Sequence, residues 1–402
     1  MNGSSSDNLK KPSLTTPADY AQLLTEATEI RGVSLWQDAW RRLRRKRIAM
    51  LSLGFLVVLV ILALLTPLLP LQSPIRQDAQ DRKFQPPNWQ AVSLRGERHH
   101  RQLKELHASH ARATGKTRKE LAEQIGYMES RDHQINVLWH KPGGLTRLLI
   151  QTRMRLFGDW AIPSICGTDN LGRDVLARVC WGARVSLVVG VVATLVSLLI
   201  GVSYGATAGY FGGWIDNIMM RIVDVIYSVP FIFVVIFLIT ILTEDSNKER
   251  LLAYGIDQIM IFYIVIGAIY WLTMARVVRG QVISLKNEQF IEAARTVGCS
   301  RWRIIFRHLI PNVMGIVIIY LTLTIPAVMR FEAFLSFLGL GVQPPDVSWG
   351  GLVNDGVNVI TPLKIYWWLI GFSGATLALT LFALNFLGDG LRDALDPRMK
   401  NR

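Results

Sequence analysis

The stretch that decides the fold is residues 287–312, which read NEQFIEAARTVGCSRWRIIFRHLIPN. Its first half predicts a short helix whose apolar side chains lie at helical spacing: Phe290, Ala294 and Val297. Gly298 follows at once, and glycine suits the left-handed residue that ends many helices. We therefore expect the first helix to end at Gly298.

The second half of this stretch predicts another short amphipathic helix. Ser300 can cap its N-terminus, and Pro311 restarts the chain into the next apolar block. Its apolar side chains recur at i, i+3, i+4 and i+7, on one face: Trp302, Ile305, Phe306 and Leu309. Such a pair of helices must bury an apolar face on its own protein, on a partner or on lipid. A plain interfacial helix is the alternative.

Long apolar blocks lie on both sides of this stretch. A helix of about 20 residues crosses roughly 30 Å of hydrocarbon. The blocks are Ile48–Leu65, Val185–Tyr210, Ile218–Leu242, Ile256–Met274, Val313–Leu340 and Ile365–Leu387. They predict an all-α integral membrane protein with six transmembrane helices. A cleaved signal peptide is the alternative for the first block, but the polar leader before it is too long.

Basic residues predict the orientation of these helices. The run at 41–47 precedes the first block, and the loop at 276–312 holds seven basic and two acidic residues. Both therefore belong on the cytoplasmic side. The predicted segments are a cytoplasmic N-terminal segment 1–47, a first transmembrane helix 48–71, an external loop with a helical insertion 72–182, a five-helix transmembrane core 183–390 that includes the cytoplasmic loop 276–312, and a cytoplasmic tail 391–402.

Composition and charge limit the classes of function that this chain can have. The net charge is +14, and much of the basic excess flanks the apolar blocks. That placement favours membrane anchoring, and no aromatic-plus-basic motif points to nucleic acid. Three cysteines are too few for a disulfide framework. Cys166 and Cys180 could pair if both lie outside the membrane, although their spacing does not require it.

The long external loop is basic, and long loops cross the membrane largely regardless of charge. Residues 95–135 of it read as helix-forming, either as a solvated helical insertion or as a docking surface. Gly115-Lys116-Thr117 ends like a phosphate-binding loop, but His110 stands where its first glycine belongs, so we expect no ATP there. His107 and His110 are one turn apart and could share a metal, but lone surface histidines are favoured and no metal site is predicted.

Glu292-Ala293-Ala294, followed by Gly298 and Pro311, resembles the "EAA" loop of the permease subunits of binding-protein-dependent ABC importers. In that family the loop forms a coupling helix that docks into a groove on an ATPase subunit. The resemblance implies ATPase-coupling roles for Glu292, Ala293, Ala294, Gly298, Arg301 and Trp302.

Two other segments are similar to the C-type permeases of dipeptide, oligopeptide and nickel importers. They are GTDNLGRD at 167–174 with GARVSL at 182–187, and FLGLGVQPP at 337–345 with SWG at 348–350. The resemblance covers about 165–397, with a weaker match at 36–70. The insertion at about 76–160 is longer than this group leads us to expect, and Arg330 is unusual there.

The resemblance implies a type I ABC importer permease fold and a non-catalytic subunit that forms half of a translocation pathway for peptides. Its implied partners are a second homologous permease, one or two ABC ATPase subunits that carry ATP and Mg, and an extracytoplasmic substrate-binding protein. It implies a bacterial cytoplasmic (inner) membrane location, with both termini in the cytoplasm. Nickel or a metal chelate is the alternative substrate. An ion-coupled secondary transporter and a membrane scaffold are the alternatives from other classes.

Charged residues at membrane depth usually face the interior of a helix bundle or water. Asp224 stands three residues after Arg221 and could pair with it. We name Glu332, Arg330 and Asp224 as candidates for the translocation path. The alternative is that these charges form structural ion pairs or lie near the membrane–water interface. Gly201, Gly205 and Gly209 stand four apart, which lets another helix approach closely. Pro230 and Pro326 should kink their spans.

Overall fold

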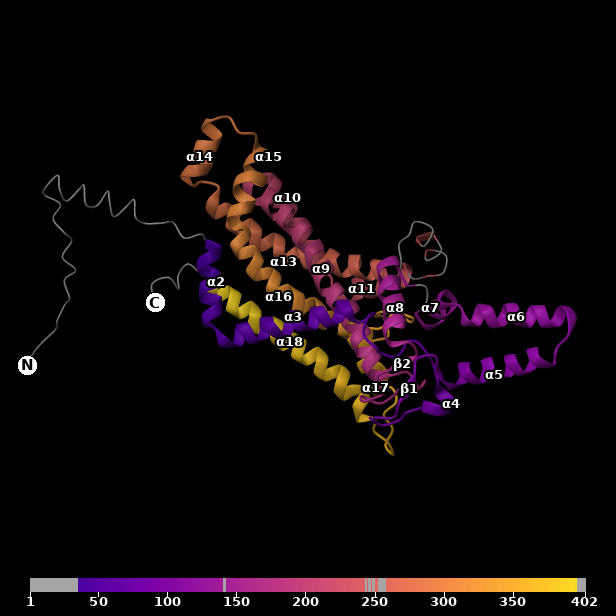
Figure 1. Cartoon of the computed structure of the whole chain (residues 1–402). Coiled ribbons are helices and arrows are strands. Elements are labelled where there is room, and N and C mark those ends of the chain that lie inside the picture. Colours follow the sequence, from indigo (N-terminus) through magenta and orange to yellow (C-terminus); the bar gives the residue numbers. More distant parts are fainter. Residues whose placement is uncertain are drawn as a thin grey trace, which may run out of the picture.

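The computed structural model describes residues 35–139, 142–242 and 258–395, together with 244, 247, 250 and 251. In these parts the chain is mostly helical (Figure 1). Residues 1–34 of the predicted N-terminal segment 1–47 and residues 396–402 of the predicted tail 391–402, with Arg398, Lys400 and Arg402, lie outside the described residues. Most of the short loop at 243–255 also lies outside them.

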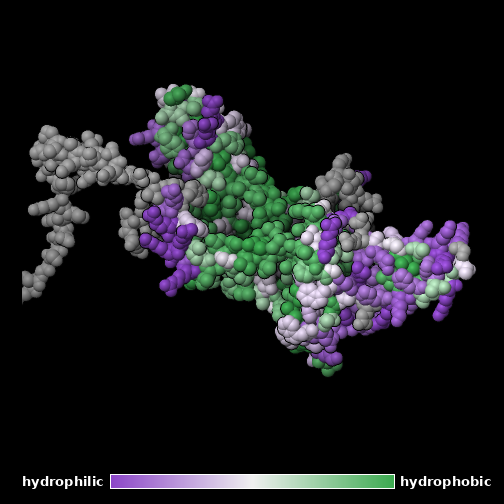
Figure 2. Space-filling view, viewed as in Figure 1, coloured by the Kyte–Doolittle hydropathy of each residue, from purple (hydrophilic) through white to green (hydrophobic). Residues whose placement is uncertain are grey.

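One bundle of long helices forms the body of the molecule. Its helices are α3 (Arg47–Leu65), α9 (Val175–Phe211), α10 (Gly213–Ser228), α11 (Phe231–Leu242), α13 (Gln258–Leu285), α16 (Ile310–Phe337) and α18 (Trp367–Leu395). Shorter helices at its margins are α2 (Leu35–Arg45), α14 (Gln289–Thr296), α15 (Arg301–Arg303) and α17 (Trp349–Val357), with the π-helix η1 over Ile304–Leu309. A broad hydrophobic belt covers this body between two hydrophilic ends (Figure 2).

Four helices are long and apolar enough to cross a membrane: α3, α9, the continuous run Arg301–Phe337, and α18. A fifth span results if Gly213–Ser228 and Ile232–Leu242, which meet at 83°, are counted as one. The prediction of six transmembrane helices is thus confirmed for four or five within the described residues. The predicted fourth block lies in α13, a single helix of 28 residues.

Two spans differ from their predicted form. α9 begins at Val175, ten residues before the predicted Val185, because Asp174 caps it there by accepting a hydrogen bond from the Ala177 N–H at 2.8 Å. The third predicted block, Ile218–Leu242, forms two helices instead of one. Helical structure stops at Val229 and Pro230, so the proline separates two helices and does not merely bend one. Pro326, in contrast, lies inside the unbroken α16.

α9 and α13 pack along one another through small residues. A Cβ added at Gly201 would come within 2.6 Å of Met274, one at Gly205 within 2.3 Å of the Ala275 carbonyl oxygen, and one at Gly209 within 2.8 Å of the Arg279 carbonyl oxygen. Backbone atoms of α13 therefore occupy the space that side chains on α9 would need.

An ion pair that sequence spacing did not indicate ties α10 to α13. Arg279 donates from Nε to Asp216 Oδ1 at 2.5 Å and from Nη2 to Asp216 Oδ2 at 2.7 Å. Asp216 is buried, so this two-pronged contact compensates the loss of hydration of its carboxylate.

Residues 72–174, here called the insertion, form a separate body beside the bundle (Figure 1). Its elements are α4 (Ala79–Arg82), β1 (Val92–Ser93), α5 (Gly96–Arg112), α6 (Gly115–Glu129), α7 (Arg131–Trp139), α8 (Gly144–Phe157) and β2 (Trp160–Ala161). β1 and β2 pair antiparallel, with Val92 opposite Ala161. α5 and α6 pack as a hairpin that projects away from the bundle.

The insertion has a hydrophobic core, against which Trp181 of α9 packs, made of Leu94, Ile135, Leu138, Trp139, Ile150, Met154 and Ala161. Its Phe84, Ile165 and Cys166 belong to a second cluster that includes Trp368 and Leu369 of α18. The Arg153 guanidinium is fully buried beside the first of these clusters and donates to the carbonyl oxygens of Leu71, Gly158 and Trp160. The two terminal nitrogens of this buried arginine thus join three separate points of the backbone, while its Nε has no partner.

A charged network fastens the end of the insertion to the bundle. Asp169 Oδ2 accepts from Arg173 Nε and from Arg178 Nη1, both at 2.7 Å. The second amino group of Arg178 reaches Asp355 on α17 at 3.0 Å. Because Asp169 and Arg178 are buried and paired, breaking either partner would leave an uncompensated charge.

Candidate functional site

The segment between α13 and α16 (residues 286–309) is the candidate site, and we call it the coupling loop. The predicted loop 276–312 is longer, because its first ten residues belong to α13 and its last three to α16. The coupling loop contains α14, which begins after Glu288, whose carbonyl oxygen accepts from the N–H groups of Ile291 at 2.9 Å and Glu292 at 3.2 Å. Arg295 donates from Nη2 to the Lys286 carbonyl oxygen at 3.3 Å, across the turn that precedes the helix. α14 is therefore held at both ends to the chain that leaves α13.

Gly298 ends α14 in the left-handed conformation, with φ +81°. Its N–H donates to the Arg295 carbonyl oxygen at 2.9 Å, and the Cys299 N–H donates to the Ala294 carbonyl oxygen at 3.0 Å. These two bonds form a Schellman motif, which satisfies carbonyls that the helix end leaves open. An L-residue at this φ is strained, so the turn between the two halves of the loop depends on glycine.

The second half of the loop does not form a separate helix. The Ser300 hydroxyl caps it by accepting from the Arg303 N–H at 3.4 Å, and α15 then runs through η1 into α16. The helix Arg301–Phe337 is continuous over 37 residues. Pro311 begins the next span as predicted, since it lies in the first turn of α16. The chain reaches it from η1 without a break.

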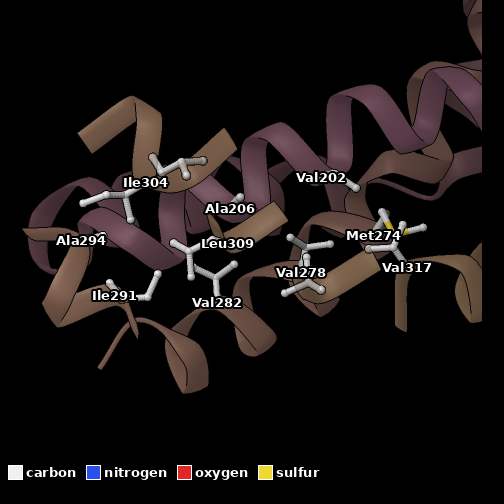
Figure 3. Packing of buried hydrophobic residues seen from close by; sticks show 12 residues of the cluster. Val202, Ala206, Met274, Val278, Val282, Ile291, Ala294, Ile304, Leu309 and Val317 are labelled. Atoms are coloured by element: carbon white, nitrogen blue, oxygen red, sulfur yellow. The ribbon is translucent and has the colours of Figure 1, made fainter. Parts of the chain in front are cut away.

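The inner face of the loop is buried against three long helices (Figure 3). Ile291 and Ala294 of α14 lie in one core cluster with Ile304, Ile305 and Leu309 of η1. The other members come from α9, α13 and α16: Val202, Ala206, Met274, Val278, Val282, Val313 and Val317. The loop and the spans thus share one hydrophobic core.

The predicted apolar faces are therefore partly wrong. In α14, Ala294 is buried with Ile291, whereas Phe290 and Val297 are exposed. In the second half, Ile305 and Leu309 are buried as expected, but Ile304 replaces Trp302 and Phe306. Within the second half, the chain forms the π-helix η1 from Ile304 onward, and its i→i+5 hydrogen bonds depart from the 3.6-residue period that the prediction assumed. The pair Ile291 and Ala294, three residues apart, was a usable signal in the sequence.

The outer face of the loop is exposed and has mixed character. Glu292 and Ala293 of α14 are exposed, as is Arg301. Trp302 is 55% exposed and Phe306 is 52% exposed, and their rings stack with centroids 6.1 Å apart. Large apolar side chains on the surface beyond the hydrophobic belt mark an interaction surface more often than an accident of packing.

Aromatic contacts connect this outer face to the end of α9. The Trp302 ring meets Phe211 edge-on, with centroids 5.9 Å apart. The Arg301 guanidinium lies 5.8 Å from the Phe211 ring, and that of Arg295 lies 5.5 Å from Tyr210. Displacement of the loop is therefore transmitted to α9 through these aromatic contacts, and to α13 and α16 through the shared core.

The candidate residues for the translocation path lie in different environments. Asp224 on α10 accepts from Arg276 Nη2 on α13 at 2.9 Å, so its partner is on another helix and is not Arg221. Arg330 is exposed. Glu332, in contrast, has no exposed surface, and its Oε1 accepts from the Ser336 hydroxyl at 2.7 Å.

The surroundings of Glu332 are tightly packed. The Ser336 and Ser348 hydroxyl oxygens are 3.3 Å apart, and the Trp349 indole N–H donates to the Val179 carbonyl oxygen at 2.9 Å. A Cβ added at Gly350 would come within 2.5 Å of Ala333. Glu332 thus lies between α16, α17 and α9 in this conformation, away from solvent.

The remaining motifs do not gather into a site. Gly115 begins α6, and Lys116 follows within that helix, so the phosphate-loop-like letters lie on a helix. Among the described residues, no three His, Cys, Asp or Glu side chains are placed to hold a metal ion. Cys166 and Cys180 are free thiols.

The chain matches two protein-family models. "Binding-protein-dependent transport system inner membrane component" covers residues 197–401, and "N-terminal TM domain of oligopeptide transport permease C" covers residues 34–87. The chain is 50% identical over 240 residues to the oligopeptide transport system permease protein OppC of Salmonella typhimurium, which is 60% of this chain and 74% of that protein. It is 44% identical over 234 residues to the dipeptide transport system permease protein DppC of Bacillus subtilis, which is 58% and 68%.

Among solved structures, the chain is similar to the MetNI methionine ABC transporter in its inward-facing conformations. The TM-score is 0.42 at 18% identity, over 55% of this chain and 96% of the other. This similarity is too weak to support an argument about fold or function.

Proposed function

Because the chain belongs to the family of binding-protein-dependent transport system inner membrane components, we propose that it is a permease subunit of an ABC importer for oligopeptides or dipeptides. The relatives named above are permeases of oligopeptide and dipeptide transport systems. Those names favour peptides over nickel or a metal chelate as the cargo. The subunit is non-catalytic, and ATP and Mg are bound by separate ATPase subunits.

This proposal rests on the difference between the buried inner face and the exposed outer face of the coupling loop. Its inner face is part of the core shared by α9, α13 and α16, while Glu292, Ala293 and Trp302 are exposed on the outside. Glu292 and the exposed aromatic rings would contact an ATPase subunit, and Gly298 would set the angle between α14 and the helix that follows. Arg301 and Trp302 would carry movement to the end of α9.

The proposed fold is that of type I ABC importer permeases, with α13 as the sixth span. Residues 1–47, the coupling loop and the tail 391–402 would lie in the cytoplasm, and the insertion would lie outside a bacterial inner membrane. The chain would form half of the pathway beside a second homologous permease. An extracytoplasmic substrate-binding protein would deliver the peptide.

The proposed mechanism is alternating access between two global states that ATP and peptide bias differently. Closure of the ATPase subunits would move the docked loop, and the shared core would pass that movement to the spans. Asp224, Arg330 and Glu332 remain candidates for the path. Glu332 would contact a peptide only in a state that opens the tight contacts between α16 and α17.

The test is uptake of a labelled peptide into proteoliposomes that hold this chain with its companion permease, ATPase subunits and binding protein. We expect uptake that requires ATP inside the vesicle, or on whichever side the ATPases face, and that persists when ionophores collapse ion gradients. Uptake that survives without ATP and is lost with the gradient would instead identify a secondary transporter. Competition by nickel but not by peptides would identify a metal importer.

A further inference from the structure

Helix α2 holds one face against the bundle and exposes the opposite face. Four apolar side chains of α2, α3 and α18 form one buried cluster: Ala39, Leu43, Ala49 and Ala394. The packing there is close, because a Cβ added at Gly390 of α18 would come within 2.5 Å of the Ala49 side chain. α2 is therefore fixed on the start of α3 and the end of α18.

The basic run at 41–47 divides into paired and unpaired side chains. Arg42 Nη2 lies 2.7 Å from Asp38 Oδ2, and the Lys46 ammonium group contacts the Asp393 carboxylate of α18. The other four basic side chains are exposed, and they form no ion pair within the described part of the chain: Arg41, Arg44, Arg45 and Arg47. Four positive charges therefore remain available to a partner.

Three of these arginines share the exposed face of α2. At about 100° per residue in an α-helix, Arg41, Arg44 and Arg45 fall within one arc, opposite the buried cluster. Trp40 lies at the edge of this arc and is 42% exposed, and the Arg44 guanidinium carbon is 4.9 Å from its ring centroid. A guanidinium held over an indole ring is weakly hydrated and already positioned. The face thus presents three charges beside one large apolar ring.

The apolar surface of α3 begins directly after the basic run. Ile48 is 61% exposed and Leu51 is 74% exposed. Hydrophilic side chains at this end of the bundle border the hydrophobic belt (Figure 2). Exposed tryptophan and arginine at such a border are typical of the membrane–water interface. The exposed face of α2 therefore lies at the level where phospholipid headgroups meet hydrocarbon.

Charge and the neighbouring apolar surface favour an anionic phospholipid as the occupant. Guanidinium groups donate paired hydrogen bonds to phosphate oxygens, and basic segments next to a span are attracted to anionic lipids. A soluble phosphate ester would contact the arginines alone, whereas the acyl chains of a lipid would also cover Trp40 and Ile48. The apolar surface thus distinguishes a lipid from a free phosphate.

We propose that the exposed face of α2 binds the headgroups of anionic phospholipids, with phosphate oxygens at Arg41, Arg44 and Arg45 and the Trp40 ring against the acyl chains. This surface is separate from the coupling loop. Its occupation does not depend on the cargo or on the transport proposed above.

The test measures how much phosphatidylglycerol and phosphatidylcholine the purified full-length chain retains in detergent, by native mass spectrometry. We expect the wild type to retain at least about five times more phosphatidylglycerol. The triple variant Arg41→Gln/Arg44→Gln/Arg45→Gln removes the three charges and should lower this preference at least about threefold. Raising the salt concentration should lower the preference of the wild type as well, because exposed charges are screened.

Two further variants separate the charge of α2 from net charge and from folding. The matched control makes the same change in net charge at exposed residues of the α5–α6 hairpin and should behave like the wild type: Arg112→Gln/Lys116→Gln/Lys119→Gln. A variant with lysine in place of the three arginines keeps the charges and should keep at least half of the preference. As a soluble probe, sn-glycerol 3-phosphate should not displace phosphatidylglycerol at equal concentration.

Four results would each overturn the proposal: no lipid preference in the wild type, an unchanged preference in the glutamine variant, an equal loss in the hairpin control, or an equal loss in the lysine variant. Displacement by sn-glycerol 3-phosphate would also overturn it and would identify a site for free phosphate esters instead. Since uptake is measured separately, failure here leaves the transport proposal standing, and the reverse also holds.

Discussion

The coupling loop and the insertion lie at opposite ends of the molecule (Figure 1) and are attached to it in different ways. The coupling loop has no core of its own, because Ile291 and Ile305 complete a cluster that α9, α13 and α16 begin. The insertion has a core around Ile135 and Ile150 and joins the bundle through a smaller cluster of Phe84 and Cys166 with Trp368, while its α5–α6 hairpin projects away from the bundle.

These two kinds of attachment allow different movements relative to the membrane spans. Tightly packed interiors transmit displacement because they have few alternative arrangements. A loop built into the core of the spans therefore moves with them, whereas the α5–α6 hairpin, which projects away from the bundle, can change without altering them. Changes in the coupling loop should affect transport first, and changes in this hairpin should affect local stability.

Gly298→Asp is the change with the largest expected effect. At φ +81° an aspartate strains the turn that orients α14. We expect ATP-dependent uptake to be abolished while the chain still inserts, as measured in proteoliposomes and by membrane fractionation. Gly158→Asp is the control from the insertion, because Gly158 also has a positive φ, of 57°, and ends α8. It should retain more than half of the uptake, and an equal loss in both variants would contradict the comparison.

Trp302→Ala and Ile305→Ala separate the two faces of the coupling loop. Trp302 is largely exposed, so its removal should weaken binding of an ATPase subunit about tenfold or more and leave the melting temperature nearly unchanged. Ile305 is fully buried, so its truncation should lower the free energy of unfolding by about 2–5 kcal/mol. Co-purification and thermal unfolding in detergent measure these effects. The reversed pattern would show that the outer face is not a docking surface.

Asp174→Asn tests the junction between the insertion and α9. Burial raises the pKa of Asp174 from 3.8 to about 6. Folding therefore favours the protonated carboxyl, and this stability is fully present below pH 3.8 and lost as the pH rises through about 6. A shift of this size corresponds to about 3 kcal/mol. We expect Asp174→Asn to be more stable than the wild type at neutral pH.

The measurement is the unfolding midpoint at pH 5 and at pH 7.5, for the wild type and for Asp174→Asn. The difference between the two pH values should be smaller in the variant. Asp81→Asn makes the same chemical change at an exposed carboxylate of the insertion and should behave like the wild type. An unchanged pH difference in Asp174→Asn would mean that Asp174 is ionised throughout this range.

Replacing Lys104–Gln124 by a short Gly-Ser linker should have the smallest effect. This change removes the projecting part of α5 and α6 but keeps Leu103 and Ile125, which are buried at the base of the hairpin. We expect uptake within about twofold of the wild type, because the removed residues project away from the bundle. A loss of uptake that additional binding protein restores would instead identify the hairpin as a docking surface.

Part of the coupling loop could be predicted because its signals are local. A helix end needs a left-handed residue, and Gly298 stands where a Schellman motif requires it. The predicted face of the second helix assumed an α-helical period through Ile304–Leu309, where the chain forms a π-helix. No local pattern indicated that helix, whose buried side chains pack in one cluster with α9, α13 and α16.

The contacts between distant helices could not be predicted from the sequence alone. Arg279 and Asp216 are 63 residues apart, and Arg276 pairs with Asp224 across 52 residues. Spacing along one helix could suggest only Arg221 as the partner of Asp224. A cavity in the insertion is similar, because it brings Asp78, His99 and Gln134 together from three separate segments.

The continuous helix Arg301–Phe337 has a mechanical consequence. At 1.5 Å per residue its 37 residues form a rod about 55 Å long. Trp302 lies at one end, Glu332 lies near the other, and Pro326 lies between them inside an unbroken helix. A tilt of this helix at Trp302 therefore also displaces the buried carboxylate of Glu332. If an ATPase subunit docks on the loop as proposed, a ligand that displaces that carboxylate changes the affinity of the loop for the ATPase by the same factor by which docking changes the affinity for the ligand.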